Sequence, residues 1–74
     1  MLKDDIGKNA GVIWQTLSDQ GKLSLTELSD ITHIEYDQAL LALGWLSREN
    51  KIEFIKREGD LYIALYTPSS ELYY

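Results

Sequence analysis

The sequence predicts a winged helix-turn-helix, an α+β domain of three helices and a small antiparallel β-sheet. Three observations carry this prediction: three segments have apolar residues at helical spacing, a capping box opens the second of them, and two alternating segments flank a glycine turn. A chain of 74 residues has room for one core. We therefore expect a single domain over 1–74, in which 67–74 form a C-terminal tail.

The first helix is expected to run from about Asp4 to Gln20, and Gly21 ends it. Asp4 and Asp5 fall in the first turn, where carboxylates interact favourably with the helix dipole. Spacings of three and four residues predict one buried stripe along this helix. The stripe consists of Ile6, Ala10, Ile13 and Leu17.

The second helix is short and opens at Ser24, because Ser24 to Glu27 match the S-x-x-E capping box. A brief extended piece over 22–24 precedes it, and helix-poor polar residues end it around Thr32 and His33. A third helix follows from about Glu35 to Asn50, so that the pair forms a helix-turn-helix. The side chains expected in the core are Leu25, Leu28 and Ile31 from the second helix and Ala39, Leu40, Leu43 and Leu46 from the third.

From Lys51 onward the pattern alternates, as in a β-strand, which predicts Ile52 and Phe54 on the inner face. A tight turn is expected at 58–60, because Gly59 accepts the positive φ that such a turn requires. The short strand over 22–24 would then join a hairpin in a three-stranded sheet. The returning strand is expected to turn Leu61, Ile63 and Leu65 inward, with Tyr62, Ala64 and Tyr66 opposite.

Three parts of the sequence carry a resemblance: the segment 42–52, which reads A-L-G-W-L-S-R-E-N-K-I, the pair Ile6-Gly7 and the run from Ala10 to Trp14. In these residues the chain resembles a set of small uncharacterised bacterial winged-helix proteins. The resemblance extends over nearly the whole chain. It implies the fold and no activity, because that family has no assigned function.

The composition disfavours several classes of partner and site. The net charge is −5 and the isoelectric point is near 4.6, whereas general affinity for nucleic acid comes from lysine and arginine. The absence of cysteine excludes a disulfide and a thiolate metal site. No uncharged stretch is long enough to span a bilayer, and the first residues lack the apolar block of a signal peptide. We therefore expect a cytoplasmic protein with no membrane partner.

No catalytic apparatus is recognisable, so we expect a protein that is not an enzyme and needs no cofactor. His33 is the only histidine, and no second imidazole is present to activate a serine or threonine. In the turn between two helices, His33 is expected to cap or to hydrogen-bond locally, the alternative being a proton switch. One histidine does not make a metal site, and no phosphate-binding glycine loop or other small-molecule site is evident.

Nucleic-acid binding is the hypothesis that the fold suggests. In a helix-turn-helix the start of the second helix of the motif enters the major groove, and here that stretch is Glu35-Tyr36-Asp37-Gln38. Its two carboxylates would oppose the phosphates, and Glu58 and Asp60 offset the basic residues of the wing. The alternative of a DNA-binding transcriptional regulator would use Tyr36, Gln38, Lys56 and Arg57.

Contact with another protein is better supported by the residues. Leu41 and Trp45 lie off the core stripe of the third helix, while Trp14 lies beside Gly7 and Gly11 on the first. If both tryptophans are partly exposed, they are typical interface anchors; the alternative is that they fill a small core or pack on the glycines.

The tail ends in the apolar residues Leu72, Tyr73 and Tyr74, which could fold back on their own domain or lie across a second copy. A domain this small, with no disulfide, has little stability to spare. We therefore expect a non-enzymatic interaction module that forms a homodimer and possibly contacts other proteins. The expected interface contains Trp14, Leu41, Trp45, Leu72, Tyr73 and Tyr74.

Overall fold

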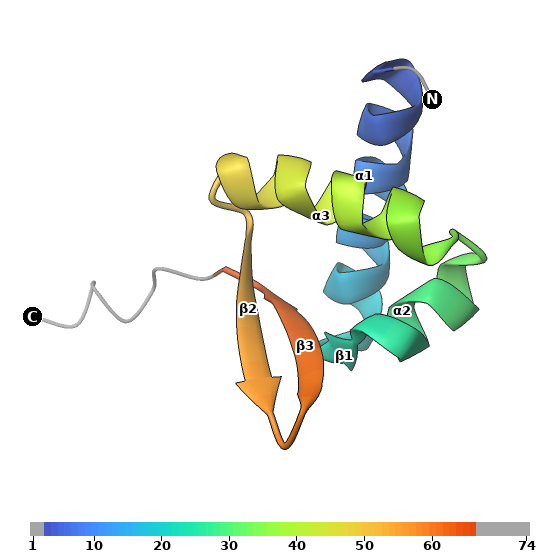
Figure 1. Ribbon diagram of the computed structural model, residues 1–74. Helices are drawn as coiled ribbons and strands as arrows, with labels where there is room; N and C mark the ends of the chain where they lie inside the picture. Colours follow the sequence, from blue (N-terminus) through green and yellow to red (C-terminus); the bar gives the residue numbers. More distant parts are fainter. Residues whose placement is uncertain (1–2, 67–74) are drawn as a thin grey trace, which may run out of the picture.

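A computed structural model describes residues 3–66, with side chains from Asp5 onward (Figure 1). Three helices and a three-stranded antiparallel sheet follow one another in the expected order, which confirms the winged helix-turn-helix. The hairpin of the last two strands projects beside the helices (Figure 1). The elements are α1 (Lys3–Gln20), β1 (Leu23–Ser24), α2 (Leu25–Thr32), α3 (Tyr36–Arg48), β2 (Ile52–Arg57) and β3 (Asp60–Leu65).

The capping box at the start of α2 is formed in full. The Glu27 amide donates to Ser24 Oγ at 3.1 Å, and the Ser24 amide donates to Glu27 Oε1 at 2.9 Å. At the other end of α2, His33 adopts a left-handed conformation with φ 61°, and its amide donates to the Ser29 carbonyl at 2.8 Å. The expected local role of His33 is therefore carried by its backbone.

The end of α3 is a Schellman motif that the sequence analysis did not anticipate. Asn50 is left-handed, with φ 59°, and its amide donates to the Ser47 carbonyl at 3.0 Å. The Lys51 amide reaches back to the Leu46 carbonyl, also at 3.0 Å. Asparagine tolerates this conformation better than most residues, so the turn is sharp and brings Lys51 back beside the last turn of the helix.

β3 is the central strand of the sheet, with β1 on one side and β2 on the other. Leu23 pairs with Ile63, so the short strand expected over 22–24 does complete the sheet. The hairpin closes through Glu58 and Gly59, whose φ angles of 50° and 89° are both positive. Two such residues are required by the turn whose twist matches a β-hairpin.

The core lies between α1, α2, α3 and the inner face of the sheet. Alanines of α1 and α3 take part in it, and small side chains let the two helices pack closely. The buried residues are Ala10, Ile13, Leu17, Leu23, Leu28, Ile34, Ala39, Ala42, Leu43, Leu46, Ile52 and Ile63.

Three residues expected in the core are exposed instead. Leu40 is 48% exposed, because the buried stripe of α3 continues through Ala42, and Leu40 lies about 100° around the helix from Ala39. Ile31 is exposed at the end of α2, one turn beyond Leu28. Phe54 lies on the same face of the sheet as the buried Ile63. It is nevertheless exposed, because β2 is an edge strand and has a neighbouring strand in this sheet on one side only.

Candidate protein-interaction site

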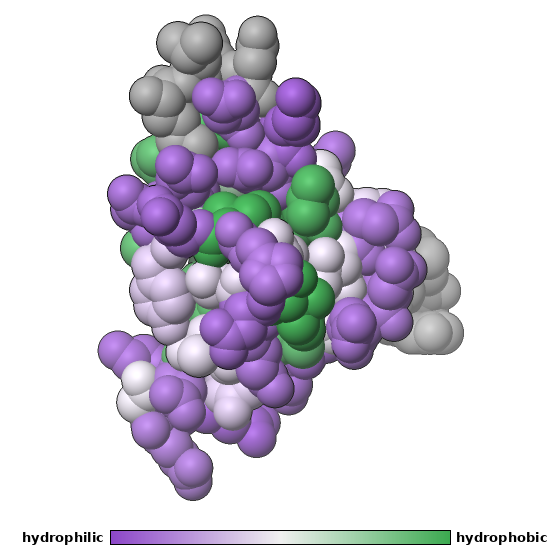
Figure 2. Space-filling view, turned by 90° about the vertical axis from the view of Figure 1, so that its right-hand side faces the viewer, coloured by the Kyte–Doolittle hydropathy of each residue, from purple (hydrophilic) through white to green (hydrophobic). Residues whose placement is uncertain are grey.

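The outer face of α3, by which we mean Leu40, Leu41, Gly44 and Trp45, is apolar. Leu41 is 50% exposed and Trp45 is 39% exposed, and both lie well away from the buried stripe around Leu43. Figure 2 shows apolar side chains at the surface between hydrophilic ones, on the side of the molecule that carries α2 and the first turns of α3. A Cβ added at Gly44 would meet no described neighbour within 4 Å, so nothing in the described chain covers this helix there.

The structure places two acidic residues at the start of α3. Glu35 is its N-cap residue, with no side-chain cap bond, and Asp37 lies in the first turn. Tyr36 donates or accepts a hydrogen bond with Thr26 Oγ1 at 2.5 Å, which ties its hydroxyl to α2, and Gln38 is half-buried. These two candidate base-contacting residues are therefore flanked by carboxylates, and one is already engaged.

The basic residues of the wing do not form a single patch. Lys56 and Arg57 are consecutive in β2, and successive side chains of a strand point to opposite faces. Arg57 lies opposite the acidic residue Asp60 in the register of the hairpin. Between the hairpin turn and the start of α2, a hollow of about 220 Å³ is lined by Gly59 and Asp60 of the turn, by Thr26 of α2 and by Tyr36 of α3. The residues of the hairpin turn that line this hollow lie opposite Ser24, Leu25 and Thr26 at the start of α2, and they include the acidic residue Asp60.

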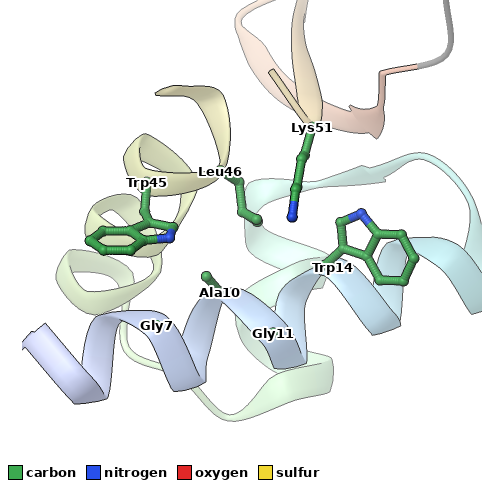
Figure 3. A pocket seen from close by; sticks show the side chains of 7 residues that line it. All are labelled: Gly7, Ala10, Gly11, Trp14, Trp45, Leu46 and Lys51. Atoms are coloured by element: carbon green, nitrogen blue, oxygen red, sulfur yellow. The ribbon is translucent and has the colours of Figure 1, made fainter. Parts of the chain in front are cut away.

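A groove of about 270 Å³ opens between α1 and α3 (Figure 3). We call it the tryptophan groove, because Trp14 of α1 and Trp45 of α3 form its two ends and each is 39% exposed. Ala10 and Leu46 lie deeper, where the two helices touch (Figure 3). The residues that line it are Gly7, Ala10, Gly11, Trp14, Trp45, Leu46 and Lys51.

The two glycines of α1 hold the groove open. A Cβ built on Gly7 or Gly11 would meet no described atom within 4 Å beyond its own stretch of helix. Neither indole therefore packs on these glycines, and neither tryptophan belongs to the buried core. Of the two alternatives drawn from the sequence, the described residues fit partly exposed tryptophans.

Among the described residues that line the groove, Lys51 is the one with a charged side chain. Its amino group points into the space between the two indoles (Figure 3). The Schellman motif at Asn50 fixes its position, and its carbonyl accepts a hydrogen bond from the Tyr66 amide at 2.9 Å. Sequence reasoning placed Trp14 beside Gly7 and Gly11 but missed Lys51; the helix-ending pair Asn50-Lys51 was the available signal.

The structure brings Trp14 and Trp45 to one groove and leaves Leu41 on the adjoining outer face of α3. The other three expected interface residues, Leu72, Tyr73 and Tyr74, lie outside the described residues. Within residues 3–66, no group of three or more metal-ligating side chains could hold a metal ion. No helix in that part of the chain is long and apolar enough to cross a membrane.

Comparison with known proteins agrees with this architecture. A solution NMR structure of protein BT2368 from Bacteroides thetaiotaomicron is similar to the chain, with 30% sequence identity and a TM-score of 0.80. The similarity covers 100% of this chain and 87% of that one. None of the curated proteins compared with the chain matches it. A model of the winged helix-turn-helix domain family DUF2582 matches residues 1–65, and the chain belongs to this family.

Proposed function

We propose that the domain is a non-enzymatic protein-interaction module that forms a homodimer through the outer face of α3. One observation carries the proposal: the face that a helix-turn-helix would present to DNA bears Leu40 and Leu41, which are 48% and 50% exposed. Leucine side chains offer no hydrogen bond to a base edge or phosphate. They contribute to binding when a second apolar surface removes them from water.

The shape of this face also favours a protein partner. Gly44 lies beside Leu41 with open space above it, and a helix approaches a glycine more closely than any other residue. Monomeric proteins seldom expose large contiguous apolar patches, and those they expose are often interaction sites. A two-fold symmetric dimer would bury the same residues from both copies, which is the commonest way for a small protein to cover such a face.

The DNA-binding alternative rests on the fold and has no matching surface in residues 5–66. Glu35 and Asp37 lie at the start of α3, and Asp60 of the wing lines the same hollow as Tyr36. A net charge of −5 adds a general repulsion from the phosphate backbone. Binding to another protein does not require a positively charged surface.

Sedimentation of the full chain tests the proposal. At tens of micromolar we expect a dimer of the 8.5 kDa chain, and we expect Leu41→Glu to yield a monomer with unchanged helical circular dichroism. Val12→Glu is the matched control, because Val12 is a similarly exposed apolar residue on α1 that does not belong to the outer face of α3. A wild-type chain that sediments as a monomer, or a dimer that Leu41→Glu leaves intact, would refute this assignment.

A further inference from the structure

We propose that the tryptophan groove is a docking site for an acidic and aromatic peptide segment, and that its occupant is the segment Glu71–Tyr74 of the same chain. The described lining of the groove has three features that favour a bound segment: two half-exposed indoles, a glycine floor with open space above it, and the amino group of Lys51. The proposal does not depend on the dimer, because the groove and the outer face of α3 share only Trp45.

The chemistry of the groove selects a narrow class of occupant. Indole rings at both ends favour aromatic or large aliphatic side chains, which stack or pack edge-to-face on them. The bare backbone at Gly7 and Gly11 lets such a side chain lie directly on the helix. The amino group of Lys51 between the indoles favours a carboxylate beside the apolar group (Figure 3).

The segment 71–74 contains both kinds of side chain that the groove favours, a carboxylate followed by apolar residues. Glu71 supplies a carboxylate, and Leu72, Tyr73 and Tyr74 supply one aliphatic and two aromatic side chains. Pairing Glu71 with Lys51 would direct the three apolar residues along the groove between Trp14 and Trp45. The charges are complementary, and the apolar content matches that of the lining.

The position of Tyr66 also allows this segment to reach the tryptophan groove. The Tyr66 amide donates a hydrogen bond to the carbonyl of Lys51, so the last described residue lies beside a residue that lines the groove. Residues 67–70 can extend over roughly 13 Å, more than the distance of about 8–10 Å between the axes of two packed helices. Pro68, Ser69 and Ser70 are residues that form turns readily, so the chain can reverse within this length.

A short connection favours the same chain over a second copy as the source. Covalent attachment through four residues gives the segment an effective concentration on the order of millimolar at its own groove. A second copy in a micromolar solution offers a concentration about a thousandfold lower. A weak site is therefore filled from its own chain first.

The indole N–H signals of Trp14 and Trp45 in a proton–nitrogen NMR spectrum report on the groove directly, and Trp14→Phe assigns them. We compare the full chain with a chain ending at Tyr66, at equal concentration, and repeat the comparison after tenfold dilution. We expect both indole signals to shift on truncation, and we expect the difference to be independent of dilution. Adding the peptide of residues 67–74 to the shortened chain should return the signals toward their full-chain positions.

Two kinds of variant make the test specific. Gly11→Leu fills the groove while adding helix propensity, so it should remove the effect of truncation; Gln15→Leu, an exposed position on the same helix outside the groove, should preserve it. Lys51→Glu and Glu71→Lys should each weaken docking, and the double exchange should restore it. Retained helical circular dichroism shows that each variant folds.

Indole signals unchanged by truncation would overturn the proposal. A difference that vanishes on dilution would overturn the choice of the same chain and assign the segment to a second copy. Sedimentation of the same samples keeps this test separate from the proposed dimer: loss of docking with an intact dimer refutes only the groove assignment, and docking in a monomer refutes only the dimer.

Discussion

Shortening Leu43 to alanine should remove a large part of the stability of the domain. The Leu43 side chain is buried between α3 and the rest of the core. Removing three carbon atoms forfeits about 2.4 kcal/mol of transfer free energy, and the cavity left behind raises the loss to about 2–5 kcal/mol. A 74-residue domain has a total unfolding free energy of roughly 4–11 kcal/mol, so the variant loses about half of it.

Urea unfolding followed by circular dichroism measures this loss. With a slope of about 1 kcal/mol per molar urea for a domain of this size, the midpoint should fall by roughly 2–5 M. Leu40→Ala is the matched control: the same substitution, three residues earlier in α3, at a side chain that is largely exposed. It should cost less than about 0.5 kcal/mol in the monomer. A Leu43→Ala midpoint near that of the wild type, or an equal loss at Leu40 at a concentration where the chain sediments as a monomer, would refute the placement of the core stripe.

Two further outcomes follow from the described structure. Ser24→Ala should lower the unfolding free energy by about 1 kcal/mol and the melting temperature by about 4–8 °C, because it removes the acceptor for the Glu27 amide. Asp30→Ala, at an exposed position of the same helix, is the comparison, and equal melting temperatures for Ser24→Ala and the wild type would contradict the capping role. A fluorescence-anisotropy titration with mixed-sequence duplex DNA near physiological salt should stay flat, because Glu35 and Asp37 lie at the start of α3; micromolar binding with a steep salt dependence would show that the charge argument is wrong.

Local sequence signals predicted most of the fold, because the features that define its elements are local. The capping box at Ser24 fixed the start of α2, and Gly59 fixed the hairpin turn. The short strand before α2 followed from the winged-helix order of elements and pairs with Ile63 as expected. Such features act within a few residues and survive in the folded chain with little change.

The errors concern side chains whose burial depends on neighbours far along the chain. Periodicity allowed either Leu40 or Ala42 to complete the stripe of α3, and the close approach of α1 favoured the smaller residue. Phe54 alternates correctly, yet its exposure depends on the position of β2 at the edge of the sheet. Alternation gives the face of a strand but gives no information about its place in the sheet order.

The candidate site, too, could be predicted only in part from the sequence. The exposure of Leu41 and Trp45 could be anticipated from their angle on α3, and the glycines beside Trp14 were visible in the sequence. That both indoles border one groove could not be anticipated, because it depends on how α1 crosses α3. The position of Lys51 depends on the left-handed residue that ends α3.

Ser24 belongs to two elements at once, and this dual membership links their local stability. It is paired with Tyr62 in the sheet, and it is the N-cap of α2, with both bonds of the capping box. Fraying of the first turn of α2 would release the residue that anchors β1, and detachment of β1 would displace the cap. Amide hydrogens of this strand and of that first turn should therefore exchange with solvent as one cooperative unit, with a common opening free energy.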